Sequence, residues 1–134
     1  MSARSASASR VRAELDRSDA GGFDLKQGEG GLVDLEFLLQ ALVLGHAAAR
    51  PALLGPRATP VLIDAAESES VVDSADADRL REAHATLLAR GLECTLDRRS
   101  RRVPLDDVIE AARAAIRDVA RRHELDFSAA ARAE

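Results

Sequence analysis

The strongest constraint in this sequence is a set of apolar residues spaced as on one face of a helix. Between residues 32 and 49 they follow the spacing i, i+3, i+4, i+7 and i+11, at Leu35, Leu38, Leu39, Leu42 and His46. This pattern predicts a buried helical stripe. Val33, Phe37 and Leu44 add apolar groups on the other faces. We therefore expect this helix to be central and mostly surrounded by other helices.

Prolines mark the end of this helix and the start of a second one. Pro51 ends the first helix, because a proline inside a helix removes a backbone donor. Residues 51–60 contain three prolines and predict a loop. Thr59 followed by Pro60 is typical of an N-cap and the first helical position. The second helix is expected to run through about Ala66.

The second half of the chain predicts two more helices. Residues 64–78 are acidic and rich in serine, so we interpret them as a solvated connection, and a third helix begins at Ser74 or Asp76. The basic loop at residues 97–102 is interpreted as a solvated surface, or alternatively as a grip for phosphate or an acidic partner. A fourth helix follows Pro104. The apolar stripe of the third helix consists of Ala77, Leu80, His84, Leu87, Leu88, Gly91 and Leu92. That of the fourth helix consists of Val108, Ile109, Ala112, Ile116, Val119 and Ala120.

Composition favours the same fold class. Aromatic residues make up 2% of the 134 residues, without Trp or Tyr, so the core must be built from Leu, Val, Ile and Ala. We predict an all-α protein, a bundle of about four main helices with a short extended Gly-rich segment before it. The expected divisions are a disordered stretch or short polar helix at 1–22, the Gly-rich segment at 23–31, the helical bundle at 32–125 and a flexible tail at 126–134.

Charge and cysteine content exclude several classes of function. A net charge of −4 argues against nucleic-acid binding. No apolar run approaches the ~20 residues that span a bilayer, so no membrane association is expected. Cys94 is the only cysteine, which excludes a disulfide framework and indicates a cytoplasmic setting. His46, His84 and His123 lack a metal-ligand spacing, so we predict structural histidines and no metal site.

The Gly-rich segment is the best candidate for chemistry. Lys26, the only lysine of the chain, precedes Gly28, Gly30 and Gly31, and a predicted helix follows directly. A glycine-rich turn before a helix N-terminus offers backbone amides and the positive end of the helix dipole to an anion, and a lysine adds a point charge. The spacing matches neither the P-loop nor GxGxxG. The alternative is therefore a glycine hinge that lets the helix pack tightly.

Two carboxylates follow the glycines. Asp34 and Glu36 suggest a metal-binding pair of the kind that holds magnesium in nucleotidyl transfer. Residues i and i+2 share a face on a strand but lie about 200° apart on a helix. Because this segment is predicted to be helical from Leu32, only one of the two carboxylates can face a given site.

The segment FDLKQGEGGLVDLEFLLQALVL, residues 23–44, resembles a known family pattern. The pattern FDLKxGxGGIxDIEFxxQ follows the catalytic core in glutamine-synthetase adenylyltransferases. The matching positions are Phe23, Asp24, Leu25, Lys26, Gly28, Gly30, Gly31, Asp34, Glu36, Phe37 and Gln40. A looser likeness, through a proline-containing loop and a helix-rich tail, extends the resemblance over most of residues 10–125.

The resemblance implies a role in nitrogen regulation. Those enzymes are bifunctional: one nucleotidyltransferase half adenylylates glutamine synthetase with ATP and magnesium, and the other removes the AMP, under control of a PII signal protein. This chain lacks their Gly-Ser turn followed by Asp-x-Asp on a strand. The resemblance therefore implies a helical-domain fragment without the catalytic core, with no catalytic residue and no cofactor of its own, which is not expected to catalyse alone.

The residues carried over are neighbours of a nucleotide site. They are Lys26, Gly28, Gly30, Gly31 and either Asp34 or Glu36. The implied partners are the missing nucleotidyltransferase core, glutamine synthetase and a PII-like protein. The alternative is a non-catalytic module that docks on glutamine synthetase, on a PII-like protein or on itself, with self-association through exposed Leu and Val. The first hypothesis predicts ATP binding that is lost in Lys26→Ala, and the second predicts partner binding indifferent to it.

Overall fold

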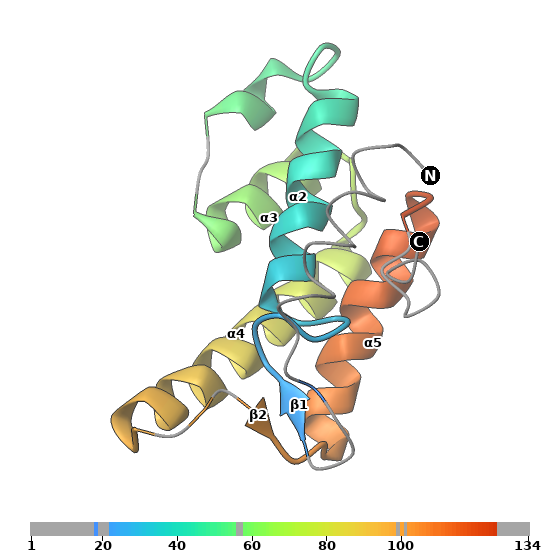
Figure 1. The fold of residues 1–134 in the computed structure, drawn as a ribbon. Helices are drawn as coiled ribbons and strands as arrows, with labels where there is room; N and C mark the ends of the chain where they lie inside the picture. The colour runs from blue at the N-terminus through green and yellow to red at the C-terminus, as the bar shows by residue number, and fades with distance from the viewer. Residues whose placement is uncertain (1–17, 19–21, 56–57, 99, 101, 126–134) are drawn as a thin grey trace.

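A computed structural model describes Ser18 and residues 22–55, 58–98, 100 and 102–125. The elements in order are β1 (Phe23–Asp24), α2 (Leu32–His46), the 3-10 helix η1 (Pro51–Leu54), α3 (Thr59–Ser68), α4 (Ser74–Leu96), β2 (Arg102–Val103) and α5 (Asp107–Arg122). The described residues form four α-helices and one small two-stranded sheet (Figure 1). The all-α prediction is confirmed. Except for Ser18 and Gly22, the expectations for 1–22 and 126–134 fall outside the described residues.

Helices α4 and α5 share the largest helix–helix interface of the fold. Each begins at an aspartate whose carboxylate accepts a backbone amide: Asp73 from Asp76 at 2.7 Å and Asp106 from Ile109 at 2.8 Å. Such caps satisfy amides that have no partner inside the helix. The Ile109 amide, together with the Arg90 guanidinium, lowers the pKa of Asp106 below its usual range. The start of α5 is thus tied to α4 by charge as well as by packing.

The core lies where α2 crosses the other helices. The predicted stripe of Leu35, Leu38, Leu39 and Leu42 is buried, and α2 contacts α3, α4, α5 and η1. The central position predicted for α2 is therefore confirmed. Its outer side is open, however, because the neighbouring helices gather on one face: Phe37 is 38% exposed and Leu44 is 58% exposed. The expectation that α2 is mostly surrounded is wrong for these two residues.

The acidic segment at residues 64–78 is not a solvated connection. Helix α3 runs through its first part, and the turn after it bends back toward the core. Ser70 has φ of +60°, and the amides of Val71 and Val72 donate to the carbonyl of Ala66 at 2.8 and 3.3 Å. Both valines are buried as a result. A residue in the left-handed conformation thus lets the chain turn back and bond the last carbonyls of the helix. The acidic composition of the segment gave no sign of this turn.

Smaller differences concern helix starts and stripes. The N-cap of α3 is Ala58, with Thr59 as the first helical residue, and the predicted proline loop contains η1. In the predicted stripes, Leu88, Leu92 and Val108 are exposed by more than half. Leu88 and Leu92 each follow a buried residue and Val108 precedes one, so all three lie at the edge of the buried face, which spacing alone does not fix. Within the described residues, no helix is both long and apolar enough to cross a membrane.

Adjacent leucines on α4 provide a test of this packing. Leu87 is fully buried and Leu88 is 53% exposed. We expect Leu87→Ala to lower the free energy of unfolding by about 2–5 kcal/mol, because it removes buried methyl groups and leaves a cavity. Leu88→Ala should change it by less than about 0.5 kcal/mol. Urea unfolding followed by circular dichroism measures both, and equal losses would contradict the assignment of the buried face.

Candidate functional site

The Gly-rich segment begins with a short strand that fixes its position. Phe23 pairs with Val103 and Asp24 with Arg102 in an antiparallel register. The sequence predicted an extended piece here but no strand pair, because two residues on each side are too few to show a strand pattern. Phe23 and Leu25 are buried in the hydrophobic core. The glycines therefore follow a backbone that is anchored in the core.

Asp24 organises the first half of the turn. Its carbonyl accepts the Gly28 amide at 2.9 Å. Its carboxylate oxygen Oδ1 accepts the amides of Lys26 and Gln27, each at 3.0 Å. An aspartate that binds its own backbone two residues on closes an Asx-type turn. Asp24, a residue of the family pattern not among the predicted site residues, is thus the organiser of the loop.

The second half of the turn caps α2. The Leu32 amide donates to the Leu25 carbonyl and the Val33 amide to the Lys26 carbonyl, each at 3.0 Å. The N-cap residue, Gly31, provides no side-chain cap. Carbonyls of the loop therefore replace the usual side-chain acceptor at this helix start.

The amides that were expected to face an anion are engaged within the chain. Besides Gly28 and Leu32, the Gly31 amide donates to the Gly28 carbonyl at 2.8 Å. The Gly30 amide donates to Oδ2 of Asp34 at 2.8 Å. The expectation of unpaired amides at these positions is wrong, since a tight turn satisfies its own donors. An anion at this segment has to be bound mainly by side chains.

The glycines are required by close approach. A Cβ on Gly28 would overlap the Phe23 ring and lie 2.6 Å from the Asp24 carbonyl oxygen. A Cβ on Gly31 would lie 2.7 Å from the Leu25 carbonyl oxygen. Gly30 has φ of +78° and meets the backbone of Arg113 on α5. These contacts support the tight packing that the alternative to an anion site predicted, although the turn that they describe is closely packed and not a hinge.

The structure separates the predicted side chains. Lys26 is exposed at the surface of the turn, and no described side chain forms an ion pair with it. Asp34 is fully buried and accepts the Gly30 amide, whereas Glu36 is exposed. As predicted for a helix, the two carboxylates do not share a face. Asp34 holds the loop. The charge of Glu36 instead acts on His84 of α4, whose pKa it raises against the effect of burial.

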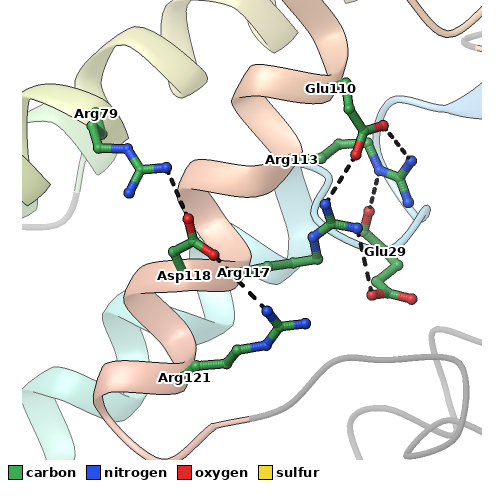
Figure 2. A network of polar contacts seen from close by, with 7 residues as sticks. All are labelled: Glu29, Arg79, Glu110, Arg113, Arg117, Asp118 and Arg121. Carbon is green, nitrogen blue, oxygen red and sulfur yellow. Dashed lines mark hydrogen bonds and ion pairs between the residues drawn. The ribbon is translucent and has the colours of Figure 1, made fainter.

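Two arginines of α5 clamp the turn from outside (Figure 2). The Arg113 Nε donates to the Glu29 carbonyl at 2.8 Å, and its guanidinium lies 4.4 Å from the centre of the Phe23 ring. Arg117 lies 3.9 Å from the Glu29 carboxylate. Both arginines also pair with Glu110, at 3.1 and 2.9 Å. Sequence reasoning missed this clamp, because no spacing rule links a loop to a helix 84 positions away.

The same face of α5 continues as a chain of ion pairs. Asp118 binds Arg79 of α4 at 3.0 Å and lies 3.9 Å from Arg121 (Figure 2). These side chains are partly exposed, so each pair contributes little stability on its own. Their effect is orientation: α5 is held against both the turn and α4.

The described residues do not form a metal site. Among them, no group of three His, Cys, Asp or Glu side chains is placed to hold a metal ion. Asp34 is committed to the Gly30 amide and points away from Glu36's side of α2. Magnesium implied by the family pattern therefore does not fit these two carboxylates as a pair. What the segment offers a ligand is the Lys26 ammonium on a rigid support.

Comparison with known proteins agrees with the pattern at residues 23–44. The family model described as GlnD PII-uridylyltransferase matches residues 2–131. Curated relatives named bifunctional glutamine synthetase adenylyltransferase/adenylyl-removing enzyme include those of Stenotrophomonas maltophilia, 56% identical over 119 residues, Xanthomonas axonopodis pv. citri, 55% over 118, and Chromobacterium violaceum, 33% over 118. These matches cover 89, 88 and 85% of the chain but only 13, 12 and 13% of the relatives' length. No solved structure matches the chain.

The glycine contacts give a sharp test. Gly28→Ala should lower the free energy of unfolding by about 1–3 kcal/mol, because the new methyl group overlaps the Phe23 ring and a backbone oxygen. Gly45→Ala is the matched control, since its Cβ would lie in open space on α2 and should raise stability by up to about 1 kcal/mol. Chemical unfolding measures both changes. A neutral Gly28→Ala would show that the turn is looser than described.

Two half-buried histidines should make the free energy of unfolding depend on pH. Burial lowers the pKa of His84 below 6.5, opposed by Glu36. Burial and the neighbouring His46 lower the pKa of His123 below 6.5, opposed by Asp76. Below pH 6.5 the unfolded chain therefore binds more protons than the folded chain, and stability falls as the pH drops until the folded-state pKa values are passed.

We expect the free energy of unfolding to be lower at pH 5.5 than at pH 7.5, and each of His84→Gln and His123→Gln to reduce that difference. Both pH values lie above the range in which Asp106, whose pKa is lowered from 3.8, takes up its proton. Urea unfolding at both pH values provides the measurement. A difference that is unchanged in both variants would assign the pH dependence to other groups.

Proposed function

We propose that this chain, which belongs to the GlnD PII-uridylyltransferase family, is the helical domain that borders the nucleotide site of a glutamine-synthetase adenylyltransferase. The observation that carries this proposal is the identity of 54–56% over 118–119 residues with bifunctional glutamine synthetase adenylyltransferase/adenylyl-removing enzymes. The chain spans about 13% of the length of those relatives. Their nucleotidyl transfer is therefore proposed for an assembly that includes a nucleotidyltransferase core, and not for this chain alone.

The proposed contribution of this domain is positional. The Gly-rich segment is bonded to itself, to β2 and to α5, so it presents Lys26 from a fixed backbone. We propose that the ammonium contacts a phosphate of the nucleotide that the core binds. ATP and magnesium would be held mainly by that core, which supplies the carboxylates that the described residues lack. The role of Gly28, Gly30 and Gly31 is then to shape the turn and not to donate their amides.

Glutamine synthetase, which the names of the relatives include, is the proposed substrate. A PII-like protein as regulator and the cytoplasm as location are proposed from the sequence resemblance and the cysteine content alone. In the rival hypothesis of an independent docking module, the Gly-rich turn acts only as a hinge. The engaged amides and the Arg113 clamp speak against that role. Self-association of the chain has no support beyond its exposed apolar residues.

A titration tests the role of Lys26. ATP, AMP and sulfate are added separately to the labelled chain and followed by NMR. A single ammonium offers few contacts, so the affinity should be millimolar at best, which corresponds to about −4 kcal/mol. We expect salt-sensitive shifts at residues 26–30 that are lost in Lys26→Ala.

Arg98→Ala is the matched control, because it also removes one exposed cation but lies in the loop after α4. It should leave the shifts at residues 26–30 intact. If the shifts cluster on residues 97–102 instead, or persist in Lys26→Ala, the nucleotide role fails for this segment.

A further inference from the structure

Helix α4 carries a line of leucines that the fold leaves uncovered. Leu88, Leu92 and Leu96 are 53, 58 and 74% exposed. Their spacing of four residues places them along one side of α4, and we call them the α4 leucine stripe. Buried residues of the same turns, Leu87 and Cys94, already face the core. The stripe is therefore a second apolar side of α4, and it lies outside the hydrophobic core.

The position of the stripe connects it with the Gly-rich segment. The last turns of α4 project away from the other helices, at the end of the molecule where β1 and β2 lie (Figure 1). Leu96 is the last residue of α4, and Arg102, six positions later, begins the strand that pairs with β1. Lys26 follows β1 by two residues, so the chain connects both Lys26 and the end of the stripe to the small sheet.

The size of the stripe argues against a second copy of the chain as its cover. The three exposed fractions together amount to less than two whole leucine side chains. A stable dimer buries about 800 Å² and 20–30 residues on each partner. Contacts between domains of one polypeptide are smaller, and tethering raises the effective concentration of the two surfaces. The relatives are long enough for such a partner, because this chain matches only 13% of their length.

We propose that the α4 leucine stripe docks on an apolar surface of the nucleotidyltransferase core. This inference rests on the proposed function and adds a second contact to it: Lys26 approaches the nucleotide, and the stripe fixes the helical domain on the core that binds it. Burial of leucine side chains provides the attraction. Because the stripe and Lys26 are separate, each can be removed without the other.

The test uses the full-length Stenotrophomonas maltophilia relative in which this chain replaces the 119 residues that it matches. Hydrogen exchange of the peptide covering residues 85–98 is compared between this chimera and the chain alone. We expect exchange to be at least tenfold slower in the chimera, because docking stabilises the last turns of α4. Leu92→Gln combined with Leu96→Gln should abolish the slowing, and glutamine keeps a high helix propensity.

The control variant is Leu54→Gln combined with Val61→Gln, which changes residues of similar exposure on η1 and α3. It should leave the slowing intact, and circular dichroism should show that both double variants of the chain are folded. Equal exchange in the chimera and the chain alone would overturn the proposal. Slow exchange in the chain alone that increases with its concentration would identify a second copy as the cover, and would also overturn it.

The two proposals fail separately. If ATP causes no Lys26-dependent shifts but hydrogen exchange of α4 is slower in the chimera, the nucleotide role is rejected and the docking surface is retained. Lys26-dependent shifts without any slowing of α4 would retain the nucleotide role and reject the docking surface.

Discussion

The close approach of helices is the constraint on which the rest of this structure depends, and among the described residues Phe23 is the one aromatic ring buried in the core. The largest fully buried side chains are leucine, isoleucine and valine, and small residues such as Ala83 and Ala112 line the buried sides of α4 and α5. With small groups between them, two helices can lie close together and hold their outer faces in a fixed relation. The arginines of α5 are therefore presented to the Gly-rich turn at a defined distance.

The packing of α5 places charged and polar groups of the helix against the Gly-rich turn. Its one buried aromatic residue, Phe23, lies under the guanidinium of Arg113, and the same guanidinium binds the Glu29 carbonyl. Asp24 and Asp34 hold the two halves of the turn from inside. Asp34, one of the two carboxylates that the sequence suggested as a metal-binding pair, is thus used for structure, and the exposed Lys26 ammonium is the group left for a ligand.

The helices were predictable because apolar spacing reports directly on burial. The stripe of α2, the start of α4 near Ser74 and the helix after Pro104 all match the structure. Sequence reasoning failed where burial depends on contacts distant in the chain. It gave no sign that β2 pairs with β1, that Val71 turns inward, or that Arg113 reaches Glu29. It also treated the glycine amides as free, because the bonds that engage them form only once the turn has closed.

The cap of α2 by carbonyls of its own preceding loop has a mechanical consequence. Because the amides of Leu32 and Val33 bind the carbonyls of Leu25 and Lys26, the turn and the helix share one set of hydrogen bonds. The backbone of Lys26 cannot move relative to the start of α2 without breaking them. A displacement of the first turn of α2 therefore moves the backbone that carries Lys26 with it.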